Sequence, residues 1–260
     1  MTRGSAHPIL AVTGAELKIF WTGASAGVAL AVFLGLIGFF FYNSVTAYVA
    51  DSLGAAAQGL ALDASIALFS QGLTNIPLVL MLVTPLVTMR AFSPFRRGGA
   101  LDFFLTLPMG DWAFIMGQFL AAWISLGLLS LLALAPFIFL TVSGVGSPAL
   151  LLTSALGLFA LASAFAAVGL WASSLFPSPV AAGLATLGLL GLLWVLGWTA
   201  PYADPAAASL WTGLAFAPRL VRFVLGQIAW PDLLFFAILT ILALINARLG
   251  LELRRHSGAD

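Results

Sequence analysis

The sequence predicts an all-α membrane protein with six transmembrane helices and both termini in the cytoplasm. Of its 260 residues, 62% are hydrophobic and only 7% are charged, and the mean hydropathy is +1.12. A soluble domain carries about a quarter charged residues, so this chain could not cover its own surface in water. The segment 112–203 contains no Asp, Glu, Lys or Arg, and it is longer than three bilayer crossings of about 20 residues each.

Two apolar segments lie in the N-terminal third of the chain. We expect the first span at 19–42, preceded by a short interfacial helix, and interpret it as an uncleaved signal anchor. The polar interval 43–63 is expected to be a loop. The second span is expected at 64–89, where Pro77 and Pro85 each remove a helix hydrogen bond and should bend the helix.

The long uncharged segment divides at two turn sequences, SGVGSP at 143–148 and FPSP at 176–179. The resulting three spans, and a sixth that follows a polar loop, are expected at 112–141, 149–175, 180–200 and 233–248. Together the six spans form a single domain over residues 1–260. With these boundaries the one charged side chain inside a span is Arg248, which can snorkel at the end of the last. The lack of charged residues deeper in the spans counts against an ion-coupled carrier and against an intramembrane metalloprotease.

The basic residues predict the orientation of the chain, because Lys and Arg are enriched on the cytoplasmic side of membrane proteins. Eight of the ten fall on one side if both termini are cytoplasmic: Arg3, Lys18, Arg90, Arg96, Arg97, Arg248, Arg254 and Arg255. Arg219 and Arg222 fall outside. They share one helix face at a spacing of three. We expect them to pair with Asp204, Asp232 or outer-leaflet headgroups, and they are also candidates for contact with an anionic substrate.

Composition excludes several kinds of chemistry. The net charge is +1 and no basic stretch is present, so the sequence gives no indication of nucleic-acid binding. The chain has no cysteine, so it cannot form disulfides or thiolate metal sites. The two histidines stand at opposite ends of the chain, and the one lysine, Lys18, is not followed by Ser or Thr as in a phosphate-binding P-loop. We therefore expect no catalytic, metal or cofactor site on this chain, and any ATP must be bound by another.

The cytoplasmic loop 90–111 carries the most specific motif. The run PLVTMR ends at Arg90, an Arg-Arg-Gly triplet follows at 96–98, and LTLP at 105–108 precedes the third span. Between these runs, Asp102 stands before two adjacent phenylalanines. A loop that combines these charges with exposed aromatic residues should rest on a protein surface or on anionic lipid.

These motifs resemble the loop after the second span in permeases of the ABC type 2 exporter family, and they are most similar to gliding-motility-associated permease subunits. The resemblance extends to the span count and to the pattern GxIxxxDLxFF at 226–236. Residues 93–95, Ser-Pro-Phe, stand where the family usually carries acidic residues, and Ala100 replaces the usual threonine.

The resemblance implies a permease subunit of an ATP-driven exporter, located in the inner or plasma membrane of a bacterium and in contact with lipid. It implies two permease chains, identical or paralogous, and two P-loop ATPase chains that bind ATP and Mg. It also implies that the segment between the last two spans dips into the outer leaflet. The residues expected to couple this chain to the ATPase are Arg90, Arg96, Arg97, Gly98, Asp102, Phe103, Phe104, Thr106 and Pro108. The alternatives are an ATPase-independent carrier or channel, a membrane-embedded enzyme, or a membrane scaffold.

Overall fold

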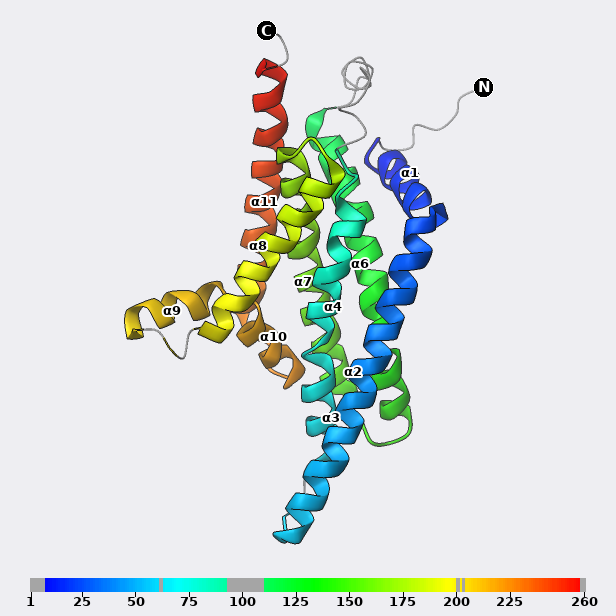
Figure 1. Cartoon of the computed structure of the whole chain (residues 1–260), viewed down its shortest axis with the longest axis vertical. Helices are drawn as coiled ribbons and strands as arrows, with labels where there is room; N and C mark the ends of the chain where they lie inside the picture. Colours follow the sequence, from blue (N-terminus) through cyan, green and yellow to red (C-terminus); the bar gives the residue numbers. More distant parts are fainter. Residues whose placement is uncertain (1–7, 61–62, 93–109, 200–201, 203, 258–260) are drawn as a thin grey trace.

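The computed structural model describes residues 8–60, 63–92, 110–199, 202 and 204–257. Throughout this part of the chain the regular structure is helical, and six segments are long and apolar enough to cross a membrane. The prediction of an all-α, multi-pass membrane protein is thereby confirmed. Figure 1 shows an elongated bundle in which α1 (Pro8–Thr22) and the C-terminal end of α11 (Trp230–Ser257) lie at the same end.

The first predicted span is wrong at both ends. The expected N-terminal helix is present as α1, but it ends just before Gly23, whose backbone is extended (φ −78°, ψ 148°), and α2 then runs over Ala24–Ala57. Residues 19–22 thus belong to α1, and most of the expected loop 43–63 is helical. Polar side chains alone do not end a helix. Here α2 ends at Ala57, two residues before Gly59, whose φ of +72° is a conformation that glycine adopts without steric cost.

The second predicted span is correct in extent but consists of two helices. These are α3 (Ala64–Leu73), capped by the carboxylate of Asp63, and α4 (Ile76–Thr88). The interruption falls between them and not at Pro77, which occupies the first turn of α4, where its missing N–H has no helical partner to lose. Pro85 lies inside α4, as predicted.

The middle three spans agree with prediction to within one residue. They are α6 (Asp111–Val142), α7 (Pro148–Leu175) and α8 (Pro179–Thr199). Helix α7 packs against α4, α6, α8, α10 and α11 and so forms the centre of the bundle. Small side chains permit this close packing, and those of α7 that are fully buried include Ala162, Ala164, Ala166, Ala167, Gly169 and Ala172.

The expected outer loop before the last span contains two helices, α9 (Pro205–Leu214) and α10 (Ala217–Val224). Figure 1 shows α9 projecting sideways from the bundle, whereas α10 packs against α7. The last helix, α11, extends beyond the predicted 233–248 at both ends.

The helices that are long and apolar enough to cross a membrane run past the predicted boundaries and include ionisable residues. Asp51 lies in α2, and the membrane-length part of α11, Trp230–Glu252, begins with Asp232 in its first turn and ends with Arg248 and Glu252. The predicted boundaries were placed at charged residues, but a helix continues through a charge that is paired or that stands near its end. An acidic residue in the first turn is even favourable, because it complements the helix dipole.

Candidate functional site

Of the residues predicted to couple the chain to an ATPase, the structure describes Arg90, which is exposed just beyond α4. The other eight lie outside the described residues: Arg96, Arg97, Gly98, Asp102, Phe103, Phe104, Thr106 and Pro108. The two ends of the loop are described, and they show how it joins the bundle.

The first end of the loop is fixed on α6 and α7. Phe92 is 2% exposed, and its backbone N–H donates to the hydroxyl of Ser173 in α7 over 3.3 Å. Its ring lies against Phe114 of α6, with the ring centroids 5.9 Å apart. A buried aromatic side chain held from two helices leaves this end of the loop little freedom to move independently of them.

The second end of the loop is linked to α11. Trp112 stands in the first turn of α6, and the guanidinium carbon of Arg248 lies 5.4 Å from the centroid of its ring, within cation–π range. Arg248 also forms an ion pair with Glu252 at 2.7 Å, one turn further along α11. The two ends of the loop therefore contact α6, α7 and α11, and we call this set of contacts the loop base.

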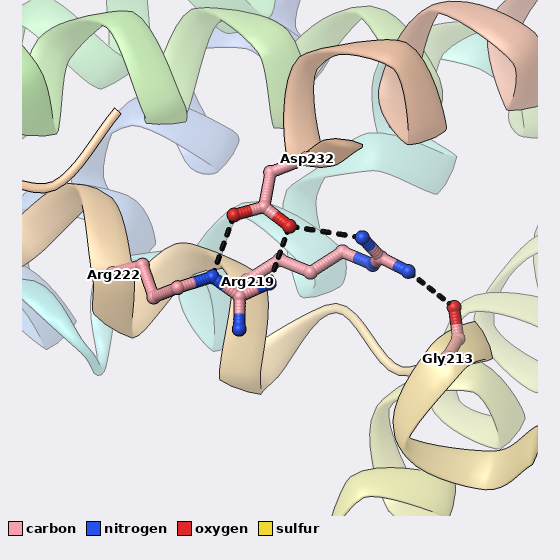
Figure 2. A network of polar contacts seen from close by, with 4 residues as sticks. All are labelled: Gly213, Arg219, Arg222 and Asp232. Carbon is pink, nitrogen blue, oxygen red and sulfur yellow. Dashed lines mark hydrogen bonds and ion pairs between the residues drawn. The ribbon is translucent and has the colours of Figure 1, made fainter. Parts of the chain in front are cut away.

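A second polar site joins α10 to the start of α11 (Figure 2). The carboxylate of Asp232 accepts a hydrogen bond from Nη1 of Arg219 at 2.9 Å, and two from Arg222, of which the Nε bond measures 2.7 Å. Arg219 also donates to the carbonyl oxygen of Gly213 in α9, and its guanidinium lies 4.0 Å from the ring centroid of Phe235. We call Arg219, Arg222 and Asp232 the charge cluster.

The charge cluster confirms the predicted pairing with Asp232, which both arginines share in place of Asp204. The side chain of Asp232 is fully buried and that of Arg219 is 13% exposed, whereas that of Arg222 is 40% exposed. The hydrogen bond to Asp232 raises the pKa of the Arg222 guanidinium still further above its usual range. The cluster contains two guanidiniums and one carboxylate, so its net charge is +1. Arg222 is the more exposed of the two cations.

A third polar contact, which the sequence did not indicate, fastens α1 to α6. Nε2 of Gln118 donates to a carboxylate oxygen of Glu16 at 2.8 Å, and the hydroxyl of Thr13 donates to the carbonyl oxygen of Gly117 at 3.1 Å. Gln118 is buried, and Glu16 lines a small cavity of about 30 Å³ between α1, α4, α6 and α7. Two features of the sequence could have pointed to this contact: Glu16 stands within an apolar segment, and Gln118 stands within the uncharged segment 112–203.

Burial raises the pKa of the Glu16 carboxyl above its usual range, and the hydrogen bond from Gln118 opposes part of that rise. Because the folded pKa exceeds the unfolded one, the contribution of Glu16 to stability is fully present below the unfolded pKa and is lost as the pH rises through the folded one.

We therefore expect Glu16→Gln to match the wild type near pH 4 and to become the more stable protein as the pH rises to about 8, since the amide keeps the hydrogen bond without a buried charge. Thermal unfolding of both proteins across this range checks the difference between their midpoints. A wild type that is the more stable protein at neutral pH would contradict this explanation.

Comparison with known proteins leaves these sites to be interpreted from their own residues. A scan against protein-family models and a search of curated proteins each found no match.

The loop base and the α1–α6 contact lie at the end of the bundle where α1 and the end of α11 are found (Figure 1). The charge cluster lies away from that end, where α10 meets α11.

Proposed function

We propose that this chain is the permease subunit of an ATP-driven exporter of the ABC type 2 family, energised by a separate P-loop ATPase. The observation that carries the proposal is the loop 90–111. Its sequence resembles the segment by which such permeases engage their ATPase, and both of its ends are anchored on core helices through Phe92 and Trp112. The chain itself performs no covalent chemistry.

The loop base suits the transmission of movement. A displacement of the loop by the ATPase would act at Phe92 on α6 and α7, and at Trp112 on α6 and α11. Protein interiors are close-packed and transmit strain rather than absorb it, so the helices would move as a unit. ATP binding on the partner would then shift the population between inward-open and outward-open arrangements of two permease copies.

The orientation of this permease follows from its charges. The end of the bundle that holds α1, the loop base and the end of α11 carries Lys18, Arg90 and Arg248, and the sequence predicts eight of the ten basic residues on one side of the membrane. By the positive-inside rule this end faces the cytoplasm, where the ATPase resides. The charge cluster and the connection between α2 and α3 then face outward, in the inner or plasma membrane of a bacterium.

The proposal is tested by changing the loop. Arg96→Ala, Arg97→Ala and Phe104→Ala together should abolish co-purification with the ATPase, because they remove two cations and an aromatic anchor from one docking surface. The matched control, Arg254→Ala with Arg255→Ala, removes another adjacent arginine pair on the same predicted side and should leave co-purification intact. Membrane insertion, measured in the same preparations, should be equal in all three proteins.

An ATPase-independent carrier is the alternative that one observation favours. The helices of spanning length contain more polar groups than the sequence suggested, including Asp51 in α2 and Gln71 in α3, which are hydrogen-bonded to each other at 3.2 Å. A carrier would move its substrate in liposomes that contain the purified chain alone. The proposed permease would do so only after the ATPase and ATP are added.

A further inference from the structure

The guanidinium of Arg222 has two edges that can form paired hydrogen bonds, and Asp232 occupies one of them (Figure 2). Nε of Arg222 donates to Oδ2 of Asp232 at 2.7 Å, and Nη2 donates to Oδ1. The third nitrogen, Nη1, points away from Asp232 and has no hydrogen-bond partner among the described residues. The edge formed by Nη1 and Nη2 is therefore open, and such an edge fits two oxygens of a carboxylate or a phosphate.

The charge cluster has one positive charge more than its own carboxylate can neutralise. Both oxygens of Asp232 already accept hydrogen bonds, and Oδ1 is shared between Arg219 and Arg222. The acid in the connection between α8 and α11 is Asp204, which forms no ion pair within the part of the chain that the structure describes. The side chain of Arg222 is 40% exposed, so an anion from outside the protein can reach its open edge.

The charge cluster lies at the depth of lipid headgroups. The membrane-length part of α11 begins at Trp230, two residues before the shared carboxylate. Trp230 is exposed, as is common for tryptophan at a membrane–water interface. Arg219 also binds Gly213 of α9, a helix that leaves the bundle sideways and exposes Leu210 (Figure 1). A helix with that direction and exposed apolar side chains suits the plane of the interface.

Apolar side chains surround the open edge on the protein surface. Leu225 is exposed one turn beyond Arg222, and Ile228 is exposed in the connection to α11. The backbone N–H of Gln227 donates to the carbonyl oxygen of Arg222 at 2.8 Å, which holds this connection against the end of α10. A cation with apolar neighbours at headgroup depth suits a ligand that joins an anionic group to an apolar part, which is the chemistry of a phospholipid.

We propose that the open edge of Arg222 binds the phosphate of an anionic phospholipid. One N–H of Nη1 and one of Nη2 would donate to two phosphate oxygens, while Asp232 holds the opposite edge and so fixes the orientation of the guanidinium. The single negative charge of the headgroup balances the surplus charge of the cluster, whereas a zwitterionic headgroup would add another cation beside it. This assignment does not depend on the chain being a permease, because it requires no ATPase.

The test is a fluorescence titration of the full chain in maltoside micelles. The chain has no cysteine, so Ile228→Cys provides a single attachment point for an environment-sensitive fluorophore near Arg222. Phosphatidylglycerol should change the fluorescence saturably, and phosphatidylcholine with the same acyl chains should bind more weakly. Arg222→Gln in the labelled protein should weaken phosphatidylglycerol binding by about two- to fivefold, the range of an exposed ion pair. The matched control, Arg90→Gln, removes an exposed arginine elsewhere and should leave the titration unchanged.

A measurement on labelled protein that retains Arg222 keeps the proposal testable if Arg222→Gln fails to fold. Added NaCl should weaken the binding of phosphatidylglycerol but not that of phosphatidylcholine, because salt screens exposed charges. Inorganic phosphate at the concentration of the lipid should not displace phosphatidylglycerol, and displacement would identify a soluble anion as the ligand instead of a lipid. The proposal is also overturned if the two lipids bind equally, if salt has no effect, or if folded Arg222→Gln binds phosphatidylglycerol as tightly as the protein with Arg222.

Discussion

Replacing Asp232 with alanine is expected to lower the free energy of unfolding by about 3–5 kcal/mol. Asp232 is fully buried and is the shared partner of Arg219 and Arg222. Its removal leaves Arg219, which is 13% exposed, without a counter-charge and brings two guanidiniums into mutual repulsion. The loss is measured as a lower midpoint of thermal unfolding for the purified protein in detergent, followed by tryptophan fluorescence.

A matched variant distinguishes the effect of leaving the two arginines unpaired from the effect of losing the carboxylate itself. Arg219→Met and Arg222→Met combined with Asp232→Leu removes the whole charge cluster, and we expect a stability close to that of the wild type, because apolar replacement of a complete buried ion pair is often neutral or better. If the triple variant is as unstable as Asp232→Ala, the cluster stabilises the junction of α10 and α11 by some means other than charge compensation.

Gly169→Ala is expected to destabilise the protein by about 1–3 kcal/mol through overpacking. Gly169 lies in α7, and a Cβ atom added there would stand 2.8 Å from both Cβ and Cγ2 of Thr88 in α4 and closer still to its hydroxyl oxygen. Thr88 is fully buried and its hydroxyl is bonded to the carbonyl of Thr84, so it cannot turn aside. The central helices would have to separate. Thermal unfolding measures the effect.

Gly188→Ala is the control for this packing, and its effect should have the opposite sign. Gly188 lies in α8, and none of the described atoms comes within 4 Å of a Cβ built there. Alanine has the higher helix propensity, by up to about 1 kcal/mol, so this variant should be as stable as the wild type or slightly more stable. Equal destabilisation by both substitutions would show that the α4–α7 contact is not tight.

The boundaries of the three middle helices are predicted well from the sequence, because proline and glycine residues mark the turns between them. Pro148 and Pro179 each start a helix, since their fixed φ suits the first turn and their missing N–H is not needed there. Such signals are local, so the boundaries of α6, α7 and α8 could be read to within one residue.

The sequence failed where a helix continues through polar residues. No proline stands between Asn43 and Ala57, so α2 has no reason to stop there, although its polarity suggested a loop. Gly23 was equally ambiguous. Glycine is common in membrane helices, and only the packing of α1 on α6 through Thr13 and Glu16 shows why the chain bends at this glycine.

The candidate sites divide in the same way. The pairing of Arg219 and Arg222 with a nearby acid could be predicted, because Asp232 is only ten to thirteen residues away. The contact between Glu16 and Gln118 spans 102 residues, and no local sequence pattern encodes a contact of that range.

We propose above that an ATPase drives this chain through the loop 90–111. Affinity purification of the wild type and of the Arg96→Ala, Arg97→Ala, Phe104→Ala variant from mild-detergent extracts of the native cells tests it most directly. A soluble protein with a P-loop should co-purify with the wild type in equal amount and should be lost from the variant, while both proteins insert into the membrane equally. A wild type that carries no ATPase, or a variant that retains it, would rule out coupling through this loop.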